Sequence, residues 1–379
     1  MKIELISKND KNTFDAFVLK NNSSSLQSFE WGEFQESFNR DVLRYFVKEN
    51  GKIILSASVL VYSLPFKKKY FYIPYGPVVS SEAGAEKINE AFSMLIADLK
   101  IKAKKEKAIF LKVEQEYPKI DLLDLGFKKS EKDVQARETL ILDISKPEDE
   151  LLRDMKQKTR YNIKVAQKHN VKIFEIANKA AAFDMFYKIL AETSKRNGFR
   201  LHPKRYYENM VDMFFSHDSG SSRNAISGVL TEAQPSSPDG ELGVSAQKKE
   251  YSEKSRPELK ERIFFAECEG KIIASALVGI FGKRATFLHG ASSDEHKNVM
   301  APYLLHWEIA KKMKALGCSE YDFWGIVTEK TDPKKREQWE GFSRFKMGFG
   351  GDIFEYQGAY DLSLQKLWHL AYKIARKFS

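Results

Sequence analysis

The feature that most constrains the fold is a strand–turn–helix–strand segment near the C-terminus. Strand-like residues Thr286–Gly290 precede a polar turn, and Pro302–Leu316 has the length and the ends of a helix. Pro302 lies in the first helical turn, where its missing N–H costs no hydrogen bond, and Gly317 follows as a helix stop. A further strand is predicted at Tyr321–Trp324. The segment therefore predicts a strand-rich unit interrupted by helices.

The same plan occurs twice along the chain. The first copy has predicted strands at Leu43–Val47, Ile53–Tyr62, Tyr70–Ile73 and Ile109–Val113, a helix at Glu86–Lys107, and its last strands within Glu131–Ile144. The second has a strand at Ile173–Glu175, helices at Ala180–Asn197 and His202–Phe215, strands at Ile263–Glu267 and Lys271–Phe281, and the segment above. With 379 residues, the chain is long enough for two domains with separate cores. We expect an α/β (α+β) protein with domains at 1–150 and 151–356.

The stretch 216–260 differs from its surroundings. Ten of its 45 residues are serine and its only aromatic residue is Tyr251. Such a segment buries too little apolar area to offset the entropy of ordering. We expect a mobile insert in the second domain.

Composition narrows the class of protein. The formal net charge is +10, which favours a polyanionic partner such as tRNA, a nucleotide-linked sugar or an anionic membrane face. Alternatively, the charge reflects a generally lysine-rich composition. No apolar run reaches the ~18–20 residues of a membrane span, and the N-terminus lacks a signal-peptide core, so a cytoplasmic protein is expected. Two cysteines without CxxC spacing and no HExxH pair predict neither a metal site nor a disulfide framework.

Four segments carry a family resemblance. They are LQSFEWGEF (Leu26–Phe34), the ILD strand and KxRYNI helix within Thr139–Ile173, the segment Leu288–Ile326, and FSRFKMGFGGDIFEYQGAYDL (Phe342–Leu362). In this order they resemble the Fem family of aminoacyl-tRNA-dependent transferases, which build the interpeptide bridge of peptidoglycan.

The resemblance implies a fold and a reaction. The fold is two GNAT-like domains, each a mixed, mostly antiparallel sheet flanked by helices, with residues 357–379 returning to the first domain. The reaction is aminolysis, in which a stem-peptide amine attacks the aminoacyl ester of tRNA without a cofactor. The implied partners are aminoacyl-tRNA and lipid II or UDP-MurNAc-pentapeptide, and a monomer is favoured. Two alternatives are an acyltransferase with another acyl donor and an inactive nucleic-acid-binding relative.

Lys346 is the first candidate catalytic residue. It lies between Phe345 and Phe349, in the FK motif where the family has a functionally important lysine. A lysine fixed there would place positive charge beside the developing oxyanion or the terminal phosphate of the tRNA. Without the resemblance, the pattern also describes a surface lysine flanked by core aromatics.

Glu114 is the second candidate catalytic residue. It follows the strand Ile109–Val113, where relatives have an acidic residue, usually Asp followed by Pro; here Gln115 follows. A carboxylate at a strand end in a cleft could accept the proton or orient the amine. The alternative is a solvated loop glutamate.

The candidate substrate contacts are Trp31, Gln35, Arg262, Tyr303 and Phe345. Arg262 opens a strand and could grip a diphosphate bidentately, unless it is a solvated charge. Tyr303 either contacts the acceptor or packs in its helix. Gln35 occupies the position of a family lysine, and this missing charge favours a lipid-linked acceptor over a UDP-linked one.

Two basic helices complete the candidates. The first has a cationic face that would contact the tRNA backbone, unless it is merely solvated, and that face contains Lys156, Lys158, Arg160, Lys164 and Lys168. The second, Gln365–Phe378, is basic and amphipathic, so it either packs on the first domain or lies on the inner face of an anionic membrane.

Overall fold

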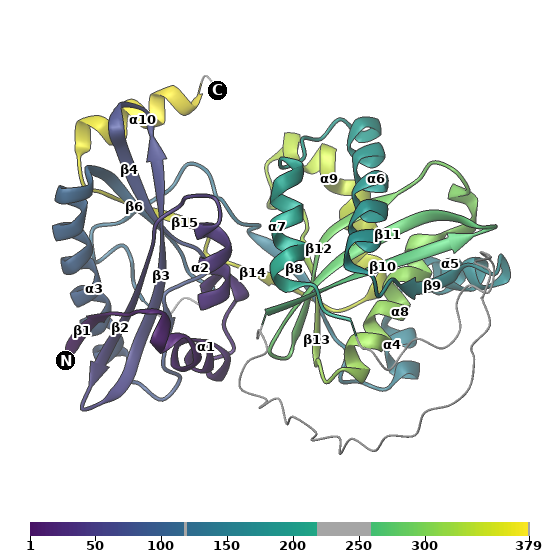
Figure 1. Ribbon diagram of the computed structural model, residues 1–379, viewed down its shortest axis with the longest axis horizontal. Coiled ribbons are helices and arrows are strands. Elements are labelled where there is room, and N and C mark those ends of the chain that lie inside the picture. The colour runs from purple at the N-terminus through teal and green to yellow at the C-terminus, as the bar shows by residue number, and fades with distance from the viewer. Residues whose placement is uncertain (117–119, 218–258, 378–379) are drawn as a thin grey trace, which may run out of the picture.

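The computed structural model describes residues 1–116, 120–217 and 259–377. Two β-sheets stand next to each other, and helices flank both of them (Figure 1). Each sheet is mostly antiparallel with one parallel pair, β4 with β6 in the first and β12 with β13 in the second. The predicted fold class is thereby confirmed. Most of the stretch expected to be a mobile insert, 218–258, lies outside the described residues.

The first sheet has the strand order β1-β2-β3-β4-β6-β15-β7, with β5 on β3. Its strands are β1 (Lys2–Leu5), β2 (Val42–Glu49), β3 (Lys52–Leu64), β4 (Lys68–Ile73), β5 (Val78–Val79), β6 (Ala108–Glu114), β7 (Lys128–Lys129) and β15 (Ala359–Ser363). Helix α3 (Ala85–Glu106) packs on one face through a stripe at helical spacing that includes Phe92 and Leu95. Helices α1 (Lys11–Lys20), α2 (Phe29–Glu36) and α10 (Lys366–Lys377) lie on the other face.

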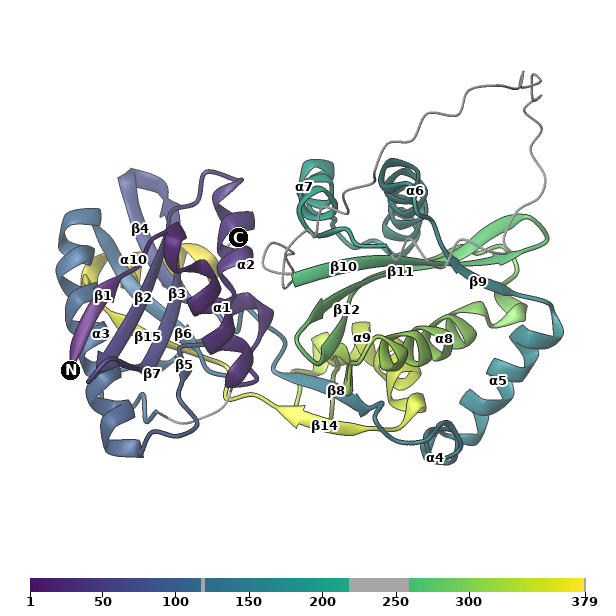
Figure 2. The ribbon, with the colours of Figure 1, turned by 60° about the horizontal axis from the view of Figure 1, so that its bottom comes forward.

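The second sheet has the strand order β14-β8-β13-β12-β11-β10-β9. Its strands are β8 (Glu138–Asp143), β9 (Lys172–Glu175), β10 (Leu259–Cys268), β11 (Lys271–Phe281), β12 (Arg284–Ser292), β13 (Glu320–Gly325) and β14 (Asp352–Glu355). Its helices are α4 (Glu148–Asp154), α5 (Gln157–Lys168), α6 (Lys179–Asn197), α7 (Lys204–Phe214), α8 (Ala301–Ala315) and α9 (Pro333–Lys346). Figure 2 shows α6 and α7 on one face of the sheet and α8 and α9 on the other.

In the part of the chain that the structure describes, the backbone crosses between the sheets twice. After β7 it leaves the first sheet, and β8 pairs with β13 and β14 in the second. The prediction assigned residues 131–144 to the first domain, so the boundary must move ahead of Glu138. The reason is that an apolar strand pattern shows that a strand forms but not which sheet it joins. After β14 the chain returns, and β15 pairs with β6 in the first sheet.

An apolar core joins the two domains. Phe34 of α2 contacts Tyr206 and Phe214 of α7, with ring centroids 5.1 and 5.8 Å apart. The Glu30 carboxylate accepts the Leu259 N–H at the start of β10, 2.6 Å away. These contacts fix helix α2 of the first domain against the second. Within the described ranges, none of the helices combines the length and the apolarity needed to span a bilayer.

Candidate functional site

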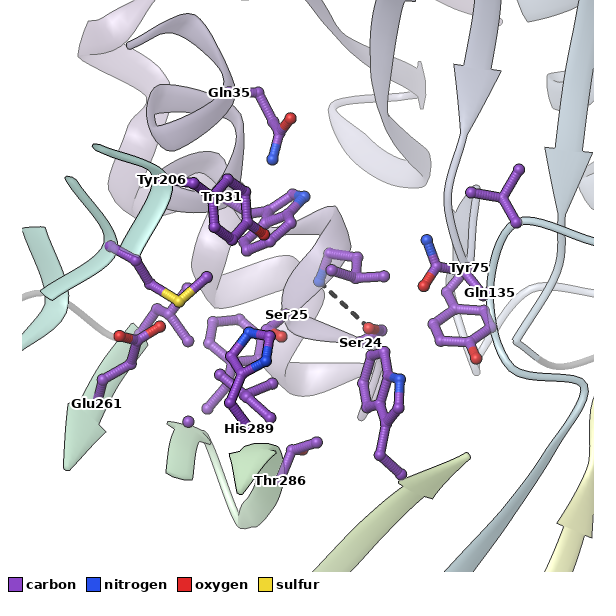
Figure 3. Close-up of a pocket in the computed structure, with 18 of the residues that line it drawn as sticks. Ser24, Ser25, Trp31, Gln35, Tyr75, Gln135, Tyr206, Glu261, Thr286 and His289 are labelled. Atoms are coloured by element: carbon purple, nitrogen blue, oxygen red, sulfur yellow. Dashed lines mark hydrogen bonds between the residues drawn. The ribbon is translucent and has the colours of Figure 1, made fainter. Parts of the chain in front are cut away.

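A cavity of about 770 Å³ lies between the two domains. Its volume falls in the range of ordinary ligand pockets, roughly 300–1,000 Å³. The first domain contributes Trp31 and Gln35 from α2 and the serines near Ser24; the second contributes Glu261 from β10 and His289 from β12 (Figure 3). Because both domains form the wall, a ligand in this cavity would contact both.

A β-bulge on β13 brings a carboxylate to the cavity wall. The register between β13 and β8 shifts between Asp322 and Gly325, and Trp324 adopts a positive φ of 61°. Asp322 and Trp324 both line the cavity, and an Asp322 oxygen accepts the Trp324 N–H at 2.7 Å. Burial raises the pKa of Asp322, against hydrogen bonding from Thr139. Bulges and strained residues of this kind are common beside active sites.

Lys346 lies on the other side of this strand. The α9 residue is 2% exposed, it does not line the cavity, and it packs among aromatic rings on the α8 face of the sheet. Its Nζ donates to the Gly325 carbonyl at 2.7 Å. Burial lowers the pKa of Lys346 to about 7, and the nearby Asp322 charge opposes that shift. Lys346 therefore contacts β13, the strand that bears Asp322, and not the cavity itself.

Glu114 also sits behind the cavity wall. Its side chain is buried, accepts a hydrogen bond from the Tyr72 hydroxyl, and accepts the Val134 and Gln135 N–H groups at 2.7 and 3.2 Å. Burial raises the pKa of Glu114, while these donors favour its charged form. Val134 and Gln135 do line the cavity. The carboxylate thus holds a segment of the wall in place.

Trp31 and Gln35 both line the cavity, as does an arginine that the sequence analysis did not single out. The Arg40 guanidinium donates to Gln35 and stacks over the Tyr62 ring, 3.9 Å from its centroid. The structure therefore supplies a cation beside Gln35, where the sequence predicted a missing charge. Its sequence position, five residues after Gln35, gave no signal.

Arg262, the predicted phosphate contact, does not line the cavity, whereas its neighbour Glu261 does. Arg262 is 2% exposed, and its Nε donates to the Glu175 carboxylate at 2.7 Å, so it is neither solvated nor on the cavity wall. Neighbouring strand residues point to opposite faces, and Glu261 lines the cavity instead. Burial raises the pKa of Glu261 well above its ordinary value. The Glu261 carboxyl group therefore lines the cavity where the sequence predicted an arginine.

Tyr303 and Phe345 also lie away from the cavity wall. Their rings pack against each other with centroids 4.9 Å apart, on the α8 side of the second sheet. This matches the alternative that the sequence left open for Tyr303, packing within the helix layer. The cavity lies on the α7 side, so the sheet separates these rings from it.

The predicted tRNA-binding face lies on α5, at the end of the second domain farther from the first (Figures 1 and 2). Lys156, Lys158, Lys164 and Lys168 are exposed. Arg160 differs from these lysines because its guanidinium is held by the protein. Its Nη1 donates to three carbonyls at the end of α4, those of Leu152, Arg153 and Met155. The face therefore presents four lysines to solvent.

The family is established by comparison with known proteins. The model of the FemAB family matches residues 10–122, 123–219 and 230–377. The chain belongs to the FemAB family. This FemAB protein is 26% identical to the lipid II:glycine glycyltransferase of Staphylococcus epidermidis, over 95% of this chain and 93% of the relative. The name of that relative agrees with the predicted enzyme class, transferase.

Solved structures confirm the architecture of this FemAB protein. It superposes on the crystal structure of FemX with a TM-score of 0.74 at 19% identity, covering 98% of this chain and 99% of that one. A tandem GNAT protein from the clavulanic acid biosynthesis pathway matches with a TM-score of 0.50 at 9% identity, over 96% and 98% of the two chains. The expected pair of GNAT-like domains is therefore confirmed.

Proposed function

We propose that this FemAB protein transfers an amino acid from aminoacyl-tRNA to the stem-peptide amine of a peptidoglycan precursor, building the interpeptide bridge. Two findings support the proposal: relatives named lipid II:glycine glycyltransferase align over nearly the whole chain, and a two-domain cavity is large enough for a ligand. The observation that carries it is Asp322, a buried carboxylate that a β-bulge aims into that cavity.

Aminolysis needs a neutral amine at the moment of attack. Asp322 has a raised pKa, so it is a stronger base than an exposed aspartate, and it takes a proton from the incoming ammonium group. The amine nitrogen then bonds to the ester carbonyl carbon, and the bond from that carbon to the ribose oxygen breaks. The first proton is released to solvent, and Asp322 then takes the second proton from the newly bonded nitrogen and passes it to the ribose oxygen as that oxygen leaves. The products are the amide, the ribose hydroxyl, one released proton and the restored carboxylate.

Lys346 and Glu114 support this chemistry as positioning residues. Lys346 fixes the Gly325 carbonyl just after the bulge and lies within electrostatic reach of Asp322. Glu114 fixes the backbone at Val134 and Gln135 on the first-domain side. Such supports hold reacting groups in the productive geometry without touching them.

The acceptor is proposed to be lipid-linked, as in the names of the relatives. Arg40 and Arg205 line the cavity, and an arginine fork suits the diphosphate of such a precursor. Trp31 and Tyr206 supply aromatic surface in the same wall. The tRNA body would lie along the second domain, with the α5 lysines near its backbone and its 3′ end in the cavity.

The test is incubation of the purified protein with a mixed pool of charged tRNAs and lipid II, followed by mass spectrometry of the precursor. The proposal predicts an increment of one or more amino-acid residues. Uncharged tRNA with free amino acids is the control for the ester donor. UDP-MurNAc-pentapeptide replaces lipid II in a parallel reaction. A further reaction replaces the charged tRNAs with acetyl-CoA. The proposal would be contradicted if neither acceptor gained mass with charged tRNA, or if an acceptor gained an acetyl group from acetyl-CoA.

A further inference from the structure

Helix α10 shows an unusual distribution of side chains. Its inner face packs on the first domain, where the His369 ring stacks on Phe110 with centroids 4.5 Å apart and Tyr372 lies 5.1 Å from the same ring. Its outer face is apolar, with Leu367, Leu370 and Ile374 exposed at 83%, 57% and 51%. Surface helices normally turn their apolar stripe toward the core. Here the stripe faces solvent.

A neighbouring hairpin extends this apolar surface. The loop between β3 and β4 carries Phe66, which is 80% exposed and whose ring lies 5.8 Å from Trp368 of α10. The two elements are joined by Lys68, which donates to Gln365 at 2.9 Å. Figure 1 shows α10 beside β4, whose first residue is Lys68. Five exposed apolar side chains from two elements therefore form one continuous patch, called here the α10 patch: Phe66, Leu367, Trp368, Leu370 and Ile374.

Basic residues lie beside the α10 patch. The helix sequence KLWHLAYKIARK contains four basic residues and no acidic one. On the described surface, Lys366 and Arg376 are exposed and Lys373 is half-buried, and the hairpin adds exposed Lys67. An apolar strip flanked by cations is the pattern of helices that lie in the interface of a membrane with anionic lipids.

The apolar strip and the basic residues together indicate which kind of partner the α10 patch binds. A second copy of this chain would cover the apolar strip, but the two basic rims would then face and repel each other. A nucleic acid would pair with the cations and leave the leucines in water. A lipid surface satisfies both features, because acyl chains cover the strip while anionic headgroups meet the rim.

We propose that α10 and the β3–β4 hairpin dock this protein on the surface of an anionic membrane. The helix lies in the plane of the headgroups with Leu367, Leu370 and Ile374 in the acyl boundary. Docking would hold the enzyme at the surface where a lipid-linked acceptor is located. The surface lies outside the cavity, so the inference stands independently of the proposed reaction.

The test is co-sedimentation of the full chain with vesicles of phosphatidylcholine alone or mixed with phosphatidylglycerol. We expect binding to the mixed vesicles only, weakening between about 100 and 500 mM salt because screening shortens the reach of the cations. Equal binding to both vesicle types, or no binding to either, would overturn the proposal.

Two variants localise the contact. Replacing Leu367, Leu370 and Ile374 with serine should reduce vesicle affinity by more than about tenfold. Replacing Lys366, Lys373 and Arg376 with glutamine should reduce it about 10²-fold, at about fivefold per charge. The matched control replaces Leu5, Ile101 and Leu316 with serine, because these residues are exposed at 56%, 59% and 40% but lie outside the α10 patch.

Wild-type affinity in both α10 variants would overturn the assignment. Light scattering supplies a second readout: a dimer that the serine variant abolishes would show that the patch joins two copies instead. Transfer to a water-soluble acceptor should be unchanged in every variant, which separates membrane docking from the chemistry of the cavity.

Discussion

Arg284 and Glu116 form a buried ion pair across the two domains, with Nη1 and Oε1 2.6 Å apart. Arg284 begins β12 of the second sheet, whereas Glu116 follows β6 of the first. The other Glu116 oxygen accepts the Ser24 N–H at 2.6 Å, and Arg284 Nε also pairs with Glu320 at 2.7 Å. Arg284 and Ser24 both line the cavity. The pair therefore fixes the cavity walls against each other.

The first prediction concerns this pair. Glu116→Gln keeps the size of the side chain but leaves the buried Arg284 cation without its charged partner in the first domain. Removing one member of a buried pair typically costs about 3–5 kcal/mol. Urea unfolding should show a loss of this order. Glu82→Gln is the control, because its pair with Lys20 is exposed, and exposed pairs contribute about 1 kcal/mol or less. Equal losses in both variants would contradict the role of the interdomain pair.

The second prediction concerns pH and Lys346. Its folded-state pKa, about 7, lies below the ordinary value of 10.5, so between these values the unfolded chain binds one more proton. Folding stability therefore rises with pH in this window, by at most about 1.4 kcal/mol per pH unit. Lys346→Met lacks this dependence. The stability of wild type relative to the variant should increase from about pH 7 to 10 and stay level below about pH 7. A constant difference across the whole range would show that Lys346 titrates normally.

The third prediction concerns Glu114. In Glu114→Gln, an amide NH₂ would replace one oxygen that accepts from the Val134 and Gln135 N–H groups. Leaving such buried donors without an acceptor costs about 1–3 kcal/mol. Thermal melting should show a lower Tm, and KM for the precursor should rise because the wall segment loosens. Glu86→Gln, at an exposed position of α3, is the control and should change stability by less than about 0.5 kcal/mol. An unchanged Tm in Glu114→Gln would show that Glu114 does not hold the wall segment in position.

The elements with strong periodic patterns were predictable from the sequence. The predicted strand at Lys271–Phe281 coincides with β11, and the helix predicted at Glu86–Lys107 matches α3 within one residue at each end. The sequence showed less well which strands pair with each other. The apolar pattern of β8 does not show which sheet this strand joins. On β10, side chains alternate between the two faces, so Glu261 and not Arg262 lines the cavity.

The centre of the candidate site was the least predictable part. Asp322 lies in the apolar run YDFW, where a single aspartate carries no motif. Its position depends on a bulge that forms only when β13 pairs with β8. Lys346 was identified through the family resemblance, but local sequence could not show that a sheet lies between it and the cavity. The positions of both Asp322 and Lys346 depend on which strands pair, and these strands are far apart in the sequence.

The fourth prediction concerns the exposed lysines of α5. If Lys158, Lys164 and Lys168 contact the tRNA backbone, replacing all three with glutamine should flatten the dependence of log affinity on log salt. Each lost contact should reduce the slope by about 0.7–0.9. The comparison is tRNA binding between about 50 and 200 mM salt. The control replaces Lys100, Lys104 and Lys105 of α3, which are equally exposed, in the first domain. Coincident slopes for wild type and the α5 variant would mean that this face is only solvated.

The most direct measurement of the central claim is the single-turnover rate of amino-acid transfer to lipid II by Asp322→Asn. The asparagine keeps the shape of the side chain but cannot accept a proton from the amine. General base catalysis typically contributes about 10²–10⁴-fold, so the rate should fall by that factor while circular dichroism stays unchanged. Asp294→Asn, an exposed aspartate in the loop after β12, is the control and should transfer at the wild-type rate. A folded Asp322→Asn protein that transfers as fast as wild type would contradict the account.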